Sequence, residues 1–367
     1  MKKLGVGLIG IQPERSWAAV AHIPALRSMP DRFEVVAVST TKQDSADAAA
    51  KACDVPNAFD SAQKLAECEA VDIVAVTFKV PHHRELVETA IRAGKHVYCE
   101  WPLGNGLGEA REMARMAKDA GVCAAVGMQA RYSPALAHAR DLIARGYVGE
   151  ILSVSVIGSG ANWGPMVDQP NAYTYDVRNG ATLLSIPVGH TMDGVCQAVG
   201  EIAELTAMLA NRRTSATLVP DMTPLDFTSP DQVLCQGTLD SGAPVSVHYR
   251  GGMPRGTGLL IEINGTEGDL QITGPAGHAQ IFDLALAGAR GDAQTPSPIA
   301  IPDSYSAGVA EGSTAGNVAR LYKALADDIA DGTHTAPDFD DAVRRHQMLD
   351  AIEASAKSGR AQRPQDC

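Results

Sequence analysis

Short apolar runs alternate with helical patterns through the first 128 residues. Leu4–Ile9, Phe33–Ser39 and residues 71–77 are largely apolar, as expected for strands that are buried on both faces of a sheet. Helices are expected at 16–29, 44–53, 83–93 and 107–120, and two further strands at 96–99 and 122–126. Buried parallel strands that alternate with helices are typical of a doubly wound sheet. We therefore predict an α/β fold in which residues 1–128 form a Rossmann domain.

The pattern changes after residue 128. Helices are expected at 134–145 and 182–199, a strand at 151–157, and a final pair of helices at 314–331 and 339–358. Residues 203–282 are mostly strand-like, and residues 240–242 and 264–268 have the composition of hairpin turns. We expect residues 129–367 to form an α+β domain with an open, mostly antiparallel sheet that serves substrate binding and oligomerisation. Residues 284–312, rich in Gly, Ala, Pro and Ser, are expected to form a loop.

Composition excludes several classes of partner. The formal net charge is −12, without the basic face that binding to nucleic acid or an anionic membrane surface requires. No run approaches the roughly 20 apolar residues of a membrane span. The seven cysteines form no Cys-x-x-Cys pair and are odd in number, which is typical of reduced thiols. We expect a cytoplasmic protein with no metal site.

A glycine pattern marks the end of the first strand. Gly5, Gly7 and Gly10 match G-x-G-x-x-G, but Gly5 and Gly7 lie inside the strand, whereas a phosphate-binding turn must follow it. The turn is therefore predicted to begin at Gly10 and to lead into a helix whose first N–H groups hold a pyrophosphate. The other residues expected to bind there are Gln12, Arg15, Ser16 and Trp17. The alternative is an ordinary strand–loop–helix connection.

The end of the second strand indicates which dinucleotide is bound. An NAD-selective site usually has an Asp or Glu there, for the ribose 2′-hydroxyl. This chain instead has Ser39, Thr40 and Lys42, which suit a 2′-phosphate. We therefore expect NADP, with NAD possible. The alternative is that Lys42 is only a solvated residue at a helix start.

Residues 77–103 carry the most specific pattern, TFKVPHHRELVETAIRAGKHVYCEWPL. His83, residues 93–97 (AGKHV) and Glu100-Trp101-Pro102 resemble the Gfo/Idh/MocA family of sugar and cyclitol oxidoreductases. The resemblance continues at 145–151, 189–193, 265–268 and 351–360, so it covers nearly the whole chain. It implies that Glu100 and Pro102 form the wall beside the nicotinamide. It places the cofactor-binding residues of this half at Thr77, His83, Glu100, Trp101, Pro102 and Gln129. The alternative for Glu100 is an exposed carboxylate at a strand end.

Two departures from the family pattern affect catalysis. The family has a lysine between the Glu and the Pro, where this chain has Trp101, and an aspartate four residues before the motif histidine, where it has Ile186. Neither side chain can move a proton, so His190 alone remains of the usual set. Both departures resemble the branch that contains the NADP-binding galactose-regulon repressor of yeasts, a dinucleotide-dependent sensor. The resemblance therefore supports the cofactor site more firmly than catalysis.

The remaining candidates belong to the second half. An imidazole titrates near neutral pH, so His190 is the expected catalytic acid and base; the alternative is a core histidine. Tyr175 or Asp176 is expected to replace the missing acid, unless Asp176 only caps a helix. The loop 162–179 is rich in polar aromatic residues, which suit sugar binding, so its Trp163, Tyr173 and Arg178 are expected to contact the substrate. Arg131, just after the last Rossmann strand, and His190 are expected to contact the substrate as well.

Two functions of different class follow from these residues. The first is an NAD(P)-dependent oxidoreductase that acts on a sugar, cyclitol or related polyol. The second is a non-catalytic NADP-sensing regulator that binds a protein partner. For the enzyme we expect a small-molecule substrate that is a polyol or sugar-like. By resemblance to the family we also expect a homodimer or homotetramer.

Overall fold

The computed structural model describes residues 3–306, 308–310 and 312–367, which divide into two compact units. The first unit comprises Met1–Met128 and Ala307–Val343, and the second comprises Gln129–Ser306 and Arg344–Cys367. The expected assignment of residues 129–367 to one domain differs from this division. Residues 307–343 pack with the first unit, a long-range association that local patterns do not carry.

A six-stranded parallel sheet forms the first unit, in the order β3-β2-β1-β4-β5-β6. Its strands are β1 (Leu4–Ile9), β2 (Phe33–Ser39), β3 (Asn57–Phe59), β4 (Ile73–Val76), β5 (His96–Glu100) and β6 (Ala124–Gly127). Its helices are α1 (Ile23–Arg27), α2 (Gln43–Ala52), α3 (Ala62–Glu67), α4 (His83–Arg92), α5 (Leu107–Ala120) and α8 (Ser313–Asp331). The predicted α/β Rossmann architecture is confirmed. The short elements β3 and α3 were not predicted.

Gly5 and Gly7 are needed for packing within β1. A Cβ at Gly5 would collide with the carbonyl oxygen of Ala70, and one at Gly7 would lie 2.7 Å from Cδ2 of Leu65. These contacts explain why two glycines interrupt an otherwise apolar central strand. Both glycines lie within β1, ahead of the turn that follows it.

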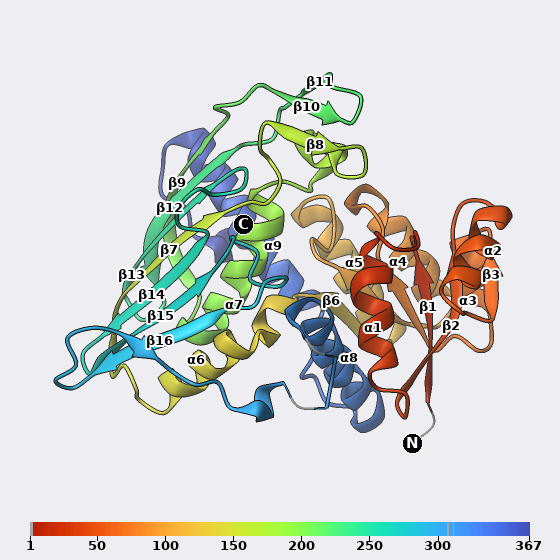
Figure 1. Cartoon of the computed structure of the whole chain (residues 1–367), viewed down its shortest axis with the longest axis horizontal. Helices are drawn as coiled ribbons and strands as arrows, with labels where there is room; N and C mark the ends of the chain where they lie inside the picture. The colour runs from red at the N-terminus through yellow and green to blue at the C-terminus, as the bar shows by residue number, and fades with distance from the viewer. Residues whose placement is uncertain (1–2, 307, 311) are drawn as a thin grey trace. The chain divides into compact units, whose positions relative to one another are not determined.

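Helix α8 completes the core of the first unit. It contacts α1 and β6, and Figure 1 shows it in blue beside the red α1. Its Tyr322 is fully buried and stacks on Tyr98 of β5, with ring centroids 4.6 Å apart. A helix from late in the sequence thus supplies part of the hydrophobic interior of the first unit.

The second unit is built on an eight-stranded sheet in the order β17-β16-β15-β14-β7-β13-β12-β9. Its strands are β7 (Ile151–Ser159), β9 (Ile202–Ala210), β12 (Gln232–Leu239), β13 (Pro244–Arg250), β14 (Leu259–Gly265), β15 (Gly268–Gly274), β16 (Ala285–Arg290) and β17 (Ser297–Pro298). Neighbouring strands are antiparallel except β7 and β13, so the predicted mostly antiparallel sheet is confirmed. The prediction of a loop over 284–312 is wrong in part, because β16 and β17 extend the sheet there.

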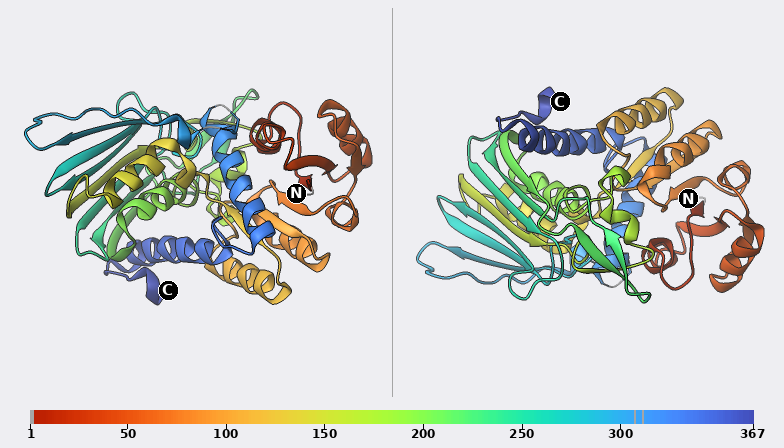
Figure 2. Two further views of the ribbon diagram at one scale, coloured as in Figure 1. Left: turned by 90° about the horizontal axis from the view of Figure 1, so that it is seen from below. Right: turned by 90° about the horizontal axis from the view of Figure 1, so that it is seen from above.

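Helices cover one face of this sheet. Figure 2 shows α6 (Pro134–Ala144) and α7 (Gly189–Val199) along it, and α6 contacts β15 and β16. The helix α9 (Phe339–Ser358) spans the division between the units. A small sheet of β8 (Met166–Asp168), β10 (Ser215–Val219) and β11 (Thr223–Asp226) completes the second unit. No helix of the described residues is both long and apolar enough to cross a membrane.

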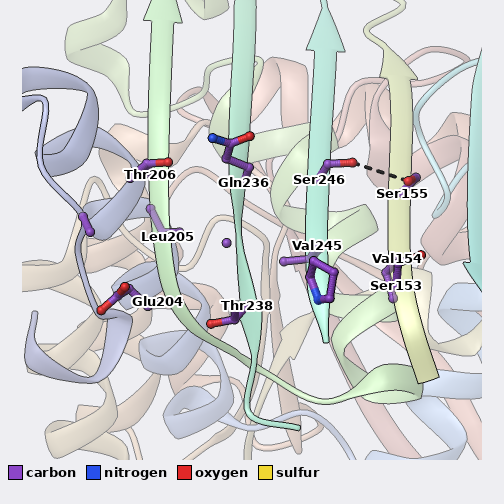
Figure 3. Close-up of a pocket in the computed structure, with 13 residues that line it drawn as sticks. Ser153, Val154, Ser155, Glu204, Leu205, Thr206, Gln236, Thr238, Val245 and Ser246 are labelled. Carbon is purple, nitrogen blue, oxygen red and sulfur yellow. Dashed lines mark hydrogen bonds between the residues drawn. The ribbon is translucent and has the colours of Figure 1, made fainter. Parts of the chain in front are cut away.

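The opposite side of the large sheet carries small polar side chains. Thr206, Gln236, Ser246 and Ser155 lie in a row across β9, β12, β13 and β7, at the bottom of a hollow of about 480 Å³ (Figure 3). Ser246 Oγ donates to Ser155 Oγ at 3.4 Å. The residue before each of them is buried, namely Leu205, Cys235, Val245 and Val154, as expected for a sheet with one solvated face. The expected homodimer or homotetramer remains a prediction.

Candidate functional site

The turn after β1 is held by one glycine and one hydroxyl. Gly10 has φ of +92°, and a Cβ there would lie 2.9 Å from the ring of Phe78, so only glycine fits. Ser16 Oγ accepts hydrogen bonds from the N–H groups of Gln12 at 2.9 Å and Ala19 at 3.3 Å. The hydroxyl thus satisfies two backbone N–H groups around the start of the helical segment Ala18–His22. Arg15 is exposed on the same turn.

Trp17 provides a test of whether a nucleotide fits here. Its indole N–H is buried and has no hydrogen-bond partner among the described residues. A buried donor without an acceptor is costly, and such donors are uncommon in native structures. An acceptor on a bound group would satisfy it. The turn therefore fits a dinucleotide, with Gly10, Gln12, Arg15, Ser16 and Trp17 as the residues that would hold it.

The end of β2 lacks an acidic side chain. Ser39 is buried, whereas Thr40 Oγ1 donates to the carbonyl of Lys42 at 2.9 Å and contacts Ser45 Oγ at 2.6 Å. Lys42 precedes α2, is exposed, and forms no ion pair in the described part of the chain. This arrangement leaves hydroxyls, a helix start and one cation beside the strand end.

Two predicted cofactor ligands instead hold loops together. Thr77 is buried and its hydroxyl donates to the carbonyl of Ile9 at 2.7 Å. His83 is 1% exposed, with Nδ1 2.9 Å from the Pro102 carbonyl and Nε2 2.9 Å from the Phe78 carbonyl. Burial is the main cause that lowers the pKa of His83. Both side chains join the ends of neighbouring strands, and the geometry gives them a supporting role.

Glu100 lies at the carboxyl end of β5 and is mostly buried, with 9% of its surface exposed. Its Oε1 is 2.8 Å from His22 Nε2, and His22 Nδ1 is 2.8 Å from the hydroxyl of Tyr322. The following Trp101–Pro102 bond is cis, and Trp101 is buried. His22 and Tyr322 were not among the predicted residues, because no local pattern relates two residues 300 positions apart.

His190 lies in the first turn of α7 and is 4% exposed. A π-helical turn, Leu184–Val188, precedes it and contains the half-buried Ile186. Three residues after His190, Asp193 is fully buried and binds Arg131 through two hydrogen bonds of 2.8 and 2.7 Å. Arg131 therefore has a carboxylate partner within its own unit, and Gln129, in the same 3₁₀ turn, is fully buried.

The aromatic loop proposed to bind sugar turns inward. Trp163 is 1% exposed, with φ of +62°, and its N–H donates to the Thr174 carbonyl at 3.1 Å. Tyr175 is fully buried, and its hydroxyl accepts from the N–H of Gly164 at 2.9 Å. These two side chains form the interior of the loop, which corrects the expectation that they face a substrate. A substrate-binding loop and a self-packed loop have the same composition, so sequence could not separate them.

Asp176 and Arg178, in the same loop, bond to one another. Asp176 accepts from the N–H of Arg178 at 3.0 Å and pairs with its guanidinium at 2.6 Å, so the capping alternative describes it best. The side chain of Arg178 is 85% exposed. Tyr173 is half-buried, and burial raises its pKa to about 12, so it keeps its proton at neutral pH. The described residues contain no cluster of His, Cys, Asp and Glu suited to a metal ion.

The parallel sheet and its glycine turn define an NAD-binding Rossmann unit joined to an α+β unit. Residues 4–128 match the model of the oxidoreductase family with an NAD-binding Rossmann fold, and residues 134–274 match that of the Gal80p C-terminal domain. The galactose/lactose metabolism regulatory protein GAL80 of Saccharomyces cerevisiae is 30% identical over 301 residues, 77% of this chain and 69% of that protein. The chain therefore belongs to the Gfo/Idh/MocA oxidoreductase family, in the branch that includes the Gal80 proteins.

Two further similarities cover the full length. The dehydrogenase aclE of Aspergillus oryzae is 28% identical over 371 residues, 98% of this chain and 97% of that protein. The crystal structure of a super-repressor mutant of Gal80p from S. cerevisiae superposes with a TM-score of 0.89 at 25% identity, covering 99% of this chain and 98% of that one. The resemblance read from the sequence motifs is confirmed. The chain is thus similar both to a regulator and to a dehydrogenase.

Proposed function

We propose that the protein is an NADP-dependent oxidoreductase that acts on a sugar, cyclitol or related polyol. The observation that carries the proposal is the turn after β1, where a Gly10 of positive φ, the Ser16 cap and the unpartnered Trp17 N–H suit a pyrophosphate. Thr40 and Lys42 favour the 2′-phosphate of NADP, because no carboxylate is present for the free 2′-hydroxyl of NAD. Membership of an oxidoreductase family supports the class of reaction.

Each residue then has a stated role. The bound nicotinamide supplies hydride transfer. Glu100 and Pro102 wall the redox-ring pocket, with Thr77 and His83 fixing the loops that carry them. An imidazole nitrogen of His190 accepts the proton of the substrate hydroxyl in oxidation and returns it in reduction. Tyr175 and Asp176 are left out of this role, because their polar atoms already serve the loop.

A second function, a non-catalytic NADP-responsive regulator that binds a protein partner, has its own support. The similarity to GAL80 favours it, and so do Trp101 and Ile186, which replace the proton-handling lysine and aspartate of the family. Such a regulator needs the same nucleotide turn. The two functions therefore differ only in whether the bound nucleotide reacts.

The experiment combines binding with turnover. A panel of sugars and polyols is incubated with NADP⁺ while the absorbance of the reduced cofactor is followed, and calorimetry gives the dissociation constant. We expect turnover that His190→Ala abolishes without changing the dissociation constant for NADP⁺. His248→Ala, at an exposed position of β13, is the control and should leave both unchanged. Tight binding without turnover across the panel would establish the regulator instead, and no binding would overturn both functions.

A further inference from the structure

Three buried side chains from distant segments form a hydrogen-bonded chain in the first unit. Tyr322 comes from α8, His22 from the turn before α1, and Glu100 from the end of β5. The two links, Tyr322 hydroxyl to His22 Nδ1 and His22 Nε2 to Glu100 Oε1, are each 2.8 Å long. Tyr322 and His22 are fully buried, so the chain runs from the core to a carboxylate that keeps 12% of its side chain exposed.

Aromatic packing fixes the two inner members. The His22 ring meets Tyr98 edge to face, with centroids 5.0 Å apart, and meets Tyr322 in the same way at 5.6 Å. Tyr322 also stacks on Tyr98. Neither ring can rotate without breaking these contacts, and so the position of His22 Nε2 is set by the core.

The three groups can be joined by hydrogen bonds that run in one direction, from Tyr322 through His22 to Glu100. Burial is the main cause that raises the pKa of Tyr322, with Glu100 contributing, so the hydroxyl keeps its proton. A hydroxyl that donates to His22 Nδ1 leaves the ring proton on Nε2, facing Glu100 Oε1. The carboxylate therefore accepts a charge-assisted hydrogen bond, one that favours its ionised form against the cost of burial.

We propose that Tyr322 and His22 are positioning residues that hold the Glu100 carboxylate ionised and fixed, and that this charge makes the site prefer the oxidised nicotinamide. The inference rests on the proposed function, in which Glu100 walls the redox-ring pocket. An oxidised nicotinamide ring carries a positive charge and a reduced ring carries none. A fixed carboxylate beside the ring stabilises the first over the second, most strongly where water is excluded.

The measured quantity is the ratio of the dissociation constants for NADP⁺ and NADPH, obtained by calorimetry on the full chain. Glu100→Gln removes the charge, and we expect the ratio to rise about tenfold. Tyr322→Phe keeps the ring and its stacking but removes the hydroxyl, and should raise the ratio about threefold. His22→Leu removes the donor to Glu100 and should raise the ratio of dissociation constants nearly as much as Glu100→Gln does. His22→Gln can still donate to Glu100 and should keep most of the wild-type ratio.

Tyr305→Phe is the matched control. The Tyr305 hydroxyl likewise contacts a histidine and a carboxylate, His138 Nδ1 at 3.2 Å and Asp141 Oδ2 at 2.7 Å, but in the second unit. Its removal should leave the ratio unchanged. An infrared difference between wild type and Glu100→Gln at neutral pH checks the charge directly and should show an ionised carboxylate.

The outcomes separate this inference from the function beneath it. An unchanged ratio in folded Tyr322→Phe and Glu100→Gln, or the carbonyl band of a protonated Glu100, would overturn the inference while leaving nucleotide binding intact. A wild-type protein that binds neither NADP⁺ nor NADPH would overturn the proposed function as well. If the His22 variants do not fold, the Tyr322→Phe ratio and the infrared band still decide.

Discussion

Arg131 donates two hydrogen bonds to the carboxylate of Asp193, from Nε to Oδ2 at 2.8 Å and from Nη2 to Oδ1 at 2.7 Å. The same carboxylate lies 3.7 Å from Nε of Arg345, whose other nitrogens bind Glu201 at 3.0 and 2.9 Å. Two cations and two carboxylates thus alternate in the second unit, from the buried Asp193 and Arg345 to the half-buried Glu201. Because Asp193 follows His190 by one helical turn, the network also fixes the start of α7.

Asp193→Asn should destabilise the second unit strongly. The substitution removes the central negative charge and leaves two guanidinium groups without it in a buried setting, a loss of about 3 kcal/mol. Urea unfolding followed by circular dichroism measures it. Glu204→Gln is the control, because its ion pair with Arg363 is exposed at both ends and should contribute less than about 1 kcal/mol. Equal losses in the two variants would contradict a special role for the network.

Gly10→Ala should weaken nucleotide binding strongly. At φ of +92°, a Cβ strains the backbone and meets the ring of Phe78 at 2.9 Å, so the turn must open. Gly94→Ala is matched to it, since Gly94 also has positive φ, at +70°, but a Cβ there meets nothing within 4 Å. We expect calorimetry to show at least a roughly tenfold weaker NADP⁺ affinity for the first variant only. Similar affinities for both variants would remove the turn from the site.

Lys42→Ala tests the preference between dinucleotides. Removing the Lys42 ammonium group, which would pair with the 2′-phosphate, should weaken NADP⁺ binding about tenfold and leave NAD⁺ binding nearly unchanged. Lys51→Ala, in the last turn of the same helix α2, changes net charge equally and should affect neither. Titrations with both nucleotides at two salt concentrations give the comparison. A parallel change for NAD⁺ and NADP⁺ would mean that Lys42 contacts no 2′-phosphate.

Acid should weaken the second unit through His278. Burial lowers the pKa of His278 to about 4, whereas a histidine of an unfolded chain titrates near 6.5. The unfolded state therefore takes up the proton first as pH falls. The contribution of the neutral ring is complete above pH ~6.5 and is lost between there and about 4, up to ~3 kcal/mol.

Urea midpoints at neutral pH and at pH ~5 measure this effect. His278→Gln should show a smaller drop on acidification than wild type, because it has no ring to protonate. A drop remains, since burial also lowers the pKa values of His83, His96 and His138. His248→Gln, at an exposed position, should behave like wild type. An undiminished drop in His278→Gln would contradict the assignment.

Much of the fold follows from local patterns. The alternation of apolar runs and helices predicts the Rossmann sheet, helix 107–120 coincides with α5, and the two hairpin turns join β12 to β13 and β14 to β15. Three-residue β3 and two-residue β17 are too short to leave a pattern. The strand β16 lies in a Gly- and Ala-rich stretch, where pairing with β15 outweighs weak strand propensity.

The candidate site, like the fold, could be predicted only in part from the sequence. The position of the glycines relative to the first strand predicts that the turn begins at Gly10, because Gly5 and Gly7 lie inside the strand. The roles of Trp163 and Tyr175 could not be read from sequence, since whether a polar aromatic side chain faces a ligand or its own loop depends on packing. His22 and Tyr322 stayed hidden for a related reason: each gains a role only when the fold brings the other near.

The return of residues 307–343 to the first unit affects how the chain is made. A ribosome releases the β1–β6 segment long before α8, with most of the second unit, Gln129–Ser306, synthesised between them. Until α8 emerges, the nascent first domain lacks Tyr322. The apolar surface beside Tyr98 therefore stays exposed to water and accessible to chaperones. Completion of this domain is therefore among the last events of biosynthesis, although its strands are the first to be translated.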